Sequence, residues 1–70
     1  KANDARAGLE DAIRAVMLLE DRAFVWDTRA HINEKLGDHE AALHDYRKAL
    51  SLDANLATSK EGLARLGATP

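Results

Sequence analysis

The stretch EKLGDHEAALHDYRKALSLDANLA, residues 34–57, contains a corner followed by a regular series of apolar residues. At the corner, Gly37 readily adopts the left-handed conformation that ends a helix, and the Asp38 side chain can accept the free amides of the next helix. Beyond it, small and large apolar residues recur at the spacing of one helix face. These residues are Ala42, Leu43, Tyr46, Ala49 and Leu50. The stretch therefore predicts a helix that ends near Gly37 and a second helix, about 39–52, that buries this face.

The rest of the chain shows the same helical spacing, interrupted by short polar segments. Apolar residues three and four apart predict one helix over about 4–19 and another over about 23–36. A fourth helix follows the turn at 53–55 and ends at Gly67. Four helices on short connections form antiparallel hairpins, so we expect an all-α fold.

Composition narrows the classes of protein to which this chain can belong. Its 70 residues fit one small domain, and a chain of this size typically buries only about 60% of its unfolded surface. The formal charge of −2 comes from interspersed charges of both signs, which disfavours nucleic acid as a partner. No apolar run approaches the roughly 18 residues of a membrane span, so we expect no membrane insertion. The absence of cysteine fits the cytoplasm and the periplasm equally, and the compartment stays open. Because the chain opens on Lys1, we expect it to be a piece of a longer protein.

An internal repeat appears when the sequence is shifted by 34 residues. The shift aligns identical residues, most of them small or apolar: Asp4 with Asp38, Ala7 with Ala41, Leu9 with Leu43, Asp11 with Asp45, Ala15 with Ala49, Leu18 with Leu52, Ala23 with Ala57 and Ala30 with Ala64. A period of this length with two helices per unit is typical of helical repeat proteins.

In this respect the chain resembles the tetratricopeptide repeat (TPR) family. The resemblance is carried by Trp26, by the small Ala30, by Leu36-Gly37-Asp38 at the corner and by the apolar series of the following helix. It implies one full repeat over 23–56, preceded by the second helix of another repeat (1–22) and followed by a capping helix and tail (57–70). The whole chain would then be a single domain, stacked as a short right-handed superhelix. We expect it to be the C-terminal end of a longer repeat protein.

Four positions depart from the pattern of the family. Arg29 stands where the family often has Leu, Asn33 where an aromatic is usual, Ala54 where Pro is usual and Lys60 where Trp or Tyr is common. The loss of Pro leaves the last turn less sharply defined, and Lys60 indicates a final helix that faces solvent.

Residue size predicts how the helices pack. Small residues let neighbouring helices approach closely: Gly8, Ala15, Ala30, Ala42, Ala49 and Ala64. Large residues should then fill the core between the helices: Trp26, Leu43, Tyr46 and Leu50. The first helix should also leave an apolar strip uncovered, made of Leu9, Ile13, Val16 and Met17. We expect that strip to be covered by the rest of a longer protein or by a second copy, so self-association into a homo-oligomer through exposed helix ends is an alternative function.

The resemblance implies that the protein is an interaction scaffold with a concave binding surface. The residues it places there are Phe24, Asp27, Thr28, His31, Lys35, Thr58, Glu61 and Arg65. Helical geometry alone puts Asp27, His31 and Lys35 on one face. The expected ligand is a protein or peptide segment. Since the acidic Asp27 and Glu61 would repel an acidic C-terminus, a basic or amphipathic segment fits better. The competing interpretation, a solvated polar face without a ligand, remains open.

Metal binding and catalysis find little support. Asp27, His31 and Glu34 could offer metal ligands, but such residues on an exposed helix mostly form ion pairs, and Asp45 can pair with Arg47 or Lys48 only loosely. The other two histidines, His39 and His44, have poor spacing for joint ligation. Neither Ser51 nor Ser59 has a His at a suitable spacing, and no Gly-rich phosphate loop occurs. We therefore expect no metal, no cofactor and no enzymatic activity.

Overall fold

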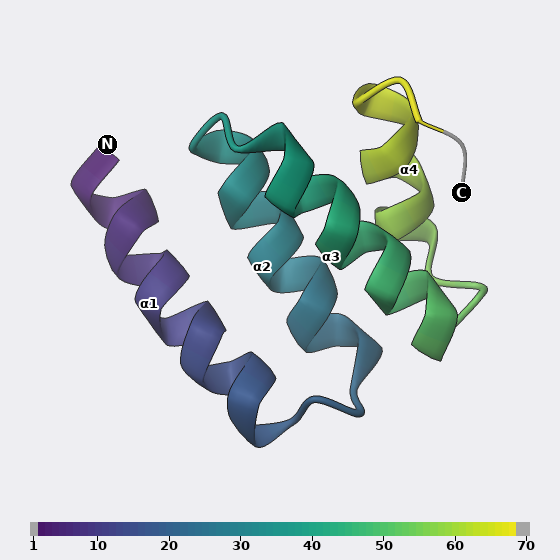
Figure 1. The fold of residues 1–70 in the computed structure, drawn as a ribbon, viewed down its shortest axis with the longest axis horizontal. Helices are drawn as coiled ribbons and strands as arrows, with labels where there is room; N and C mark the ends of the chain where they lie inside the picture. The colour runs from purple at the N-terminus through teal and green to yellow at the C-terminus, as the bar shows by residue number, and fades with distance from the viewer. Residues whose placement is uncertain (1, 69–70) are drawn as a thin grey trace.

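The computed structural model describes residues 2–68, which form four α-helices and no strand. The helices are α1 (Ala2–Leu18), α2 (Ala23–Lys35), α3 (His39–Leu52) and α4 (Ala57–Arg65). Consecutive helices run in opposite directions and are joined by short turns (Figure 1). The predicted all-α fold of antiparallel hairpins is confirmed. The handedness of the stacking stays a prediction.

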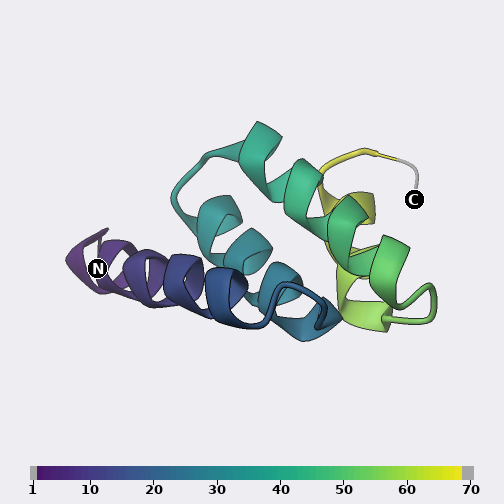
Figure 2. The same cartoon turned by 60° about the horizontal axis from the view of Figure 1, so that its bottom comes forward.

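The arrangement of the four helices centres on α2. This helix contacts each of the other three, whereas α1 packs against α2 alone among the described helices. The views in Figures 1 and 2 agree that α1 and α4 lie on opposite sides of the molecule. One face of α2 is therefore flanked by α1 and α4. Any surface that α1 and α4 share must include residues of α2.

The turn between α2 and α3 has the predicted chemistry. Gly37 has φ 83°, a conformation that residues with a side chain rarely adopt. Oδ1 of Asp38 accepts a hydrogen bond from the amide of Ala41 at 3.2 Å, so Asp38 is the N-cap of α3. A second glycine with positive φ, Gly67, follows α4. Local sequence signals therefore fix the ends of both helices.

The core lies where α2, α3 and α4 meet. Ala30, Ala42, Tyr46 and Leu63 are fully buried there, and Leu43, Leu50 and Leu66 pack against them. Ala49 is fully buried as well. Small residues at these sites bring the backbones close enough for the Tyr46 ring to fill the remaining space, as predicted. One small residue was assigned wrongly: Ala64 is exposed, and the close approach of α4 to Tyr46 occurs at the buried Gly62 instead.

Trp26 lies between α2 and α3, in contact with His44 and Lys48 of α3, but it is not part of this core, so the predicted full burial of its ring is wrong. Its side chain is only half-buried, and Nε1 donates to the carbonyl of Glu20 at 2.9 Å. The guanidinium of Arg29 and the ammonium of Lys48 lie 5.1 and 5.6 Å from the ring centroid. These cation–π contacts cover the ring with charged groups in place of apolar ones.

The predicted apolar strip on α1 is only partly exposed. Val16 is 6% exposed and Leu9 is half-buried, whereas Met17 and its neighbour Leu18 are 73% and 81% exposed. The uncovered apolar surface therefore lies mainly at the C-terminal end of α1. Within residues 2–68, none of the helices combines the length and the apolar character that crossing a lipid bilayer requires.

Candidate functional site

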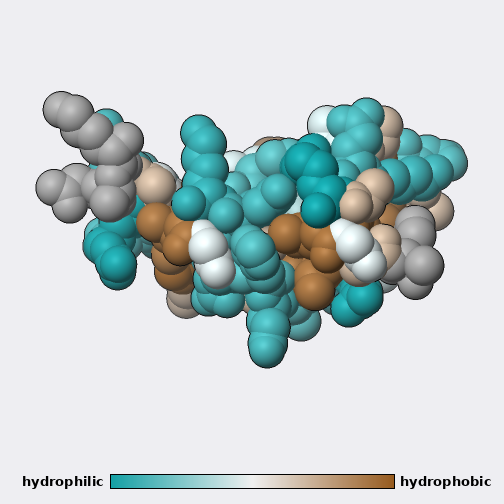
Figure 3. All heavy atoms as spheres, turned by 90° about the horizontal axis from the view of Figure 1, so that it is seen from above, coloured by the Kyte–Doolittle hydropathy of each residue, from teal (hydrophilic) through white to brown (hydrophobic). Residues whose placement is uncertain are grey.

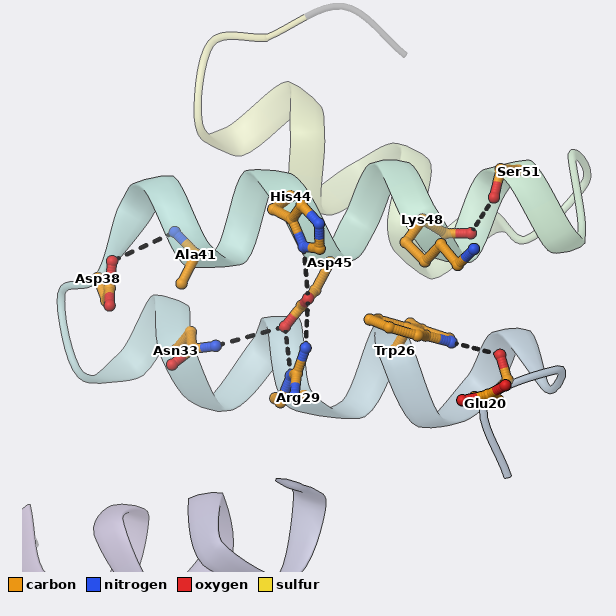
Figure 4. Close-up of polar contacts among 10 residues, drawn as sticks. All are labelled: Glu20, Trp26, Arg29, Asn33, Asp38, Ala41, His44, Asp45, Lys48 and Ser51. Carbon is orange, nitrogen blue, oxygen red and sulfur yellow. Dashed lines mark hydrogen bonds and ion pairs between the residues drawn. The ribbon is translucent and has the colours of Figure 1, made fainter. Parts of the chain in front are cut away.

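A polar cluster links α2 to α3 on one side of the hairpin (Figure 4). The Asp45 carboxylate accepts hydrogen bonds from Nε and Nη2 of Arg29 at 2.8 and 3.0 Å, and the Asp45 side chain is 2% exposed. Asn33 donates to the same carboxylate at 3.4 Å, and Nδ1 of His44 lies 3.0 Å from it. The hydrogen bonding of Arg29 to the Asp45 carboxylate raises the pKa of Arg29. The expected loose pairing of Asp45 with Arg47 or Lys48 is therefore wrong.

This cluster explains two departures from the repeat pattern together. Arg29 and Asn33, which replace apolar residues, both turn toward Asp45. Since a buried carboxylate is costly without partners, the three polar residues require one another. Each oxygen of Asp45 already has two partners, which leaves little capacity for a ligand. We interpret the cluster as a structural element of the hairpin and look for binding on the other face of α2.

On that face, a hydrogen bond fixes α4 against the first half of α2. The Ser59 hydroxyl, which is fully buried, donates to Oδ1 of Asp27 at 2.6 Å. Nδ1 of His31 lies 2.9 Å from the Asp27 carbonyl oxygen and 3.4 Å from its carboxylate. The Asp27 side chain is 15% exposed, so most of its charge is directed into the fold.

A second group fixes α4 against the end of α2. Nε and Nη2 of Arg65 donate to the two oxygens of Glu34, each at 3.0 Å, and the Tyr46 hydroxyl donates to Glu34 at 2.7 Å. The bonds from Arg65 and Tyr46 lower the pKa of Glu34 from its usual 4.5 to about 2. Burial and the bond to Glu34 raise the pKa of Tyr46, and Glu34 raises that of Arg65. Three ionisable groups from three helices thus hold one another in place.

On the face of α2 away from the Asp45 cluster, two hollows flank its C-terminal half. One, of about 320 Å³, lies between α2 and α4 and is lined by His31, Glu34, Lys35 and Arg65. The other, of about 260 Å³, lies between α1 and α2 and is lined by Asp4, Ala5, Gly8, Ile32 and Lys35. Lys35 lines both. The two hollows therefore adjoin at Lys35.

The structure places the eight residues expected on the concave surface in three settings. Asp27 and His31 are half-buried and contact each other, and Asp27 also holds Ser59. Lys35 and Arg65 are exposed and meet His31 around the α2–α4 hollow. The remaining four are exposed and line neither of the two hollows: Phe24, which is 57% exposed, Thr28, Thr58 and Glu61.

Sequence reasoning missed Glu34 as a member of this surface and the buried Ser59 as a residue that supports it from beneath. Glu34 lies one helical turn beyond His31, a spacing that does point to the same face. The partners of both residues lie on another helix: Arg65 is 31 positions from Glu34, and Ser59 is 32 positions from Asp27. A spacing close to the repeat length is the one signal that could have suggested these pairs.

Asp27, His31 and Glu34, which could have offered metal ligands, are engaged with Ser59, Arg65 and Tyr46. No group of three or more His, Cys, Asp or Glu side chains in the described part of the chain is arranged to hold a metal ion.

Comparison with known proteins identifies one relationship. Residues 23–56 match the family model described as tetratricopeptide repeat, and the match has the same bounds as the full repeat expected from the sequence. No curated protein and no solved structure gives a significant match to the chain.

Proposed function

Because residues 23–56 of the chain are a tetratricopeptide repeat, a helical unit typical of protein–protein interaction, we propose that this protein binds a peptide or protein segment on the face of α2 that is flanked by α1 and α4. The proposed role is that of a scaffold without catalysis. The eight residues expected on the concave surface belong to this proposal together with Glu34.

The observation that supports the proposal best is the interlocked hydrogen bonding around the α2–α4 hollow. Arg65 and Tyr46 both bind Glu34, and Ser59 binds Asp27, so several side chains beneath and around the hollow are already ordered. A surface whose side chains are fixed before binding loses less conformational entropy when a ligand arrives.

The charges that remain available on this surface favour an amphipathic segment. Asp27, one of the two acidic residues from which a basic partner was expected, directs its charge to Ser59 and His31. Glu34 is compensated by Arg65. Glu61 and Lys35 are exposed and carry opposite charges, so neither sign dominates.

Affinity capture from a lysate of the source organism, with three versions of the chain as bait, tests the proposal. The first bait is the unchanged chain, and the second is Lys35→Glu/Glu61→Lys, which alters the proposed surface. The third, Glu40→Lys/Arg47→Glu, alters exposed residues of α3. Both doubles keep the net charge, so nonspecific electrostatic binding changes little.

A protein retained by the first and third baits and lost from the second supports the proposed surface. Loss from the third bait alone would move the site to α3. Equal retention by all three, or no retained protein at all, would count against the proposal.

Self-association is the second candidate function, and it is favoured by the exposure of Met17 and Leu18 at the end of α1. Exposed apolar side chains that adjoin each other mark contact surfaces more often than singly scattered ones do. Light scattering of the chain alone decides the matter. A mass of two chains that falls to one in Met17→Glu/Leu18→Glu supports self-association, and a single-chain mass at high concentration excludes it.

A further inference from the structure

We propose that the α1–α2 hollow and Lys35 form a two-part subsite that takes an apolar side chain and, beside it, a carboxylate from the same partner segment. This inference rests on the proposed function and specifies the chemistry of the partner. It assigns the recognition to α1 and the C-terminal end of α2, whereas most of the residues expected from the sequence lie earlier on α2 or on α4.

The apolar part of the subsite is the floor made by Ala5, Gly8 and Ile32. All three are partly buried, so they present surface to a ligand without being fully solvated. Gly8 keeps the hollow open because it has no side chain. A Cβ atom at position 8 would stand 3.6 Å from Cδ1 of Ile32, which is an ordinary contact. Any longer side chain at this position would extend into the hollow. At about 260 Å³ the hollow has room for one aliphatic side chain. Figure 3 views the molecule from the end at which α1 begins and α2 ends, and it shows separate apolar areas in a mainly hydrophilic surface.

The charged part of the subsite is Lys35. Within residues 2–68, it makes no ion pair, although it lies between two hollows that contain carboxylates. Glu34 is taken up by Arg65 and Tyr46. Asp4 lies in the first turn of α1, where the unpaired amides of the helix stabilise a negative charge. Among the described residues, Lys35 therefore forms no ion pair, so its ammonium group is available to a carboxylate of the partner.

The spacing of the two parts limits the sequence of the partner. Ile32 and Lys35 are one helical turn apart, and such positions are about 5–6 Å apart at their Cβ atoms. In an extended segment, alternate residues lie on one side and are separated by about 6–7 Å. An apolar residue and an Asp or Glu two positions apart therefore fit the subsite together. In a helical partner, the same requirement is met by residues three or four apart.

Selection from a random peptide library displayed on phage, with the full chain as bait, tests the inference directly. We expect enrichment of peptides with Leu, Ile, Met or Phe two to four positions from Asp or Glu. The best such peptide is then synthesised with a fluorescent label, and its binding is measured by anisotropy. Lys35→Gln should weaken binding about two- to fivefold, the range of exposed ion pairs, and Lys35→Glu should weaken it further.

Variants at one position separate filling of the hollow from loss of the fold. Gly8→Leu should reduce binding at least tenfold, because its side chain occupies the hollow, whereas Gly8→Ala should bind within about twofold of the unchanged chain. Lys60→Gln, an exposed change on α4 that lines neither hollow, should have no effect. Thermal melting of each variant identifies any that fails to fold. Should Gly8→Leu fail to fold, the Lys35 variants alone decide.

The outcomes distinguish this inference from the proposed function. Selected peptides whose binding is unchanged by Lys35→Glu overturn the subsite, and if Lys35→Glu/Glu61→Lys still abolishes their binding, the proposed function stands. Enrichment of basic peptides without acidic residues also overturns the subsite. A library from which no peptide is enriched counts against both.

Discussion

Gly62 lies directly against the ring of Tyr46: a Cβ atom at position 62 would clash with Cζ of the tyrosine. Replacing a glycine inside a helix by alanine ordinarily stabilises by about 0.5–1 kcal/mol. Here the fully buried ring has no room to move, so Gly62→Ala should instead lower the free energy of unfolding by about 1–3 kcal/mol. Chemical denaturation measures the change. The matched control is Gly8→Ala, where space exists and a gain is expected; equal effects at both positions would contradict the packing of α4 on Tyr46.

Breaking the Arg29–Asp45 ion pair should lower the stability of the protein, and a second substitution should restore most of it. Asp45→Leu leaves the Arg29 guanidinium largely buried without its counter-charge, which should cost about 2–4 kcal/mol of stability. In Arg29→Leu/Asp45→Leu, apolar side chains replace both charges, and stability should return to within about 1.5 kcal/mol of the unchanged chain. Urea denaturation of the unchanged chain, Arg29→Leu, Asp45→Leu and the double variant completes a double-mutant cycle. Additive losses would show that the pair is not coupled.

Asp27 and Glu61, both assigned to the concave surface, should differ in their effect on stability. Asp27→Ala removes the acceptor of the buried Ser59 hydroxyl and should cost about 1–2 kcal/mol. Glu61 is exposed, and Glu61→Lys should stay within about 0.5 kcal/mol. Thermal melting compares them. Similar melting temperatures for the two variants would mean that the Ser59–Asp27 bond contributes little.

Glu34 should make stability depend on pH in the acid range. Its folded pKa of about 2 lies below the usual 4.5, so the unfolded chain binds more protons between these values and stability falls as the pH drops through this window. Discounted for solvent screening, the loss should be about 1–2 kcal/mol. Above about pH 5 this contribution is constant.

The comparison of the unchanged chain with Glu34→Gln isolates this contribution from that of other carboxylates. The difference in unfolding free energy between them should shrink as the pH falls from 5 toward 2. A difference that stays constant would show that Glu34 is not held by Arg65 and Tyr46 in solution.

Trp26→Ala should lower the free energy of unfolding by less than the truncation of a fully buried aromatic residue does. Truncating a buried Trp typically costs about 3–5 kcal/mol, whereas this half-buried ring should contribute about 1–2.5 kcal/mol through Arg29, Lys48 and the bond to Glu20. Denaturation followed by circular dichroism measures it, because the variant lacks tryptophan fluorescence. A loss above about 3 kcal/mol would place Trp26 in the core after all.

The features predicted well from the sequence are those set by neighbouring residues. Gly37 and Asp38 determine their turn locally, through φ and one capping bond, so its position was predictable. Tyr46 and the alanines of the core follow from the helical period, which needs no knowledge of the partner helix. The same holds for the shared face of Asp27, His31 and Lys35.

What escaped prediction depends on how the helices are rotated against each other. Arg29 and Asn33 were recognised as departures from the repeat, but Asp45 lies 16 and 12 positions away, and only the packing of α3 on α2 reveals the cluster. Ala64 was expected to be buried like Ala30, its counterpart in the repeat. Ala30 is buried in the core beside α3, whereas Ala64 is exposed at the outer edge of α4. The internal repeat predicted a small residue at both positions, but it did not predict which helix would pack against each of them.

The attachment of α1 to α2 alone has a consequence for how the molecule opens. In a chain of helices coupled only to their neighbours, the end unit can detach while the rest stays folded. Backbone amides of α1 should therefore exchange with deuterated solvent sooner than those of α3, which α2 and α4 both cover. A ligand seated between α1 and α2 binds only the closed form and should slow exchange in α1 selectively. Slower amide exchange in α1 alone would then report that a ligand occupies the hollow, whatever the identity of that ligand.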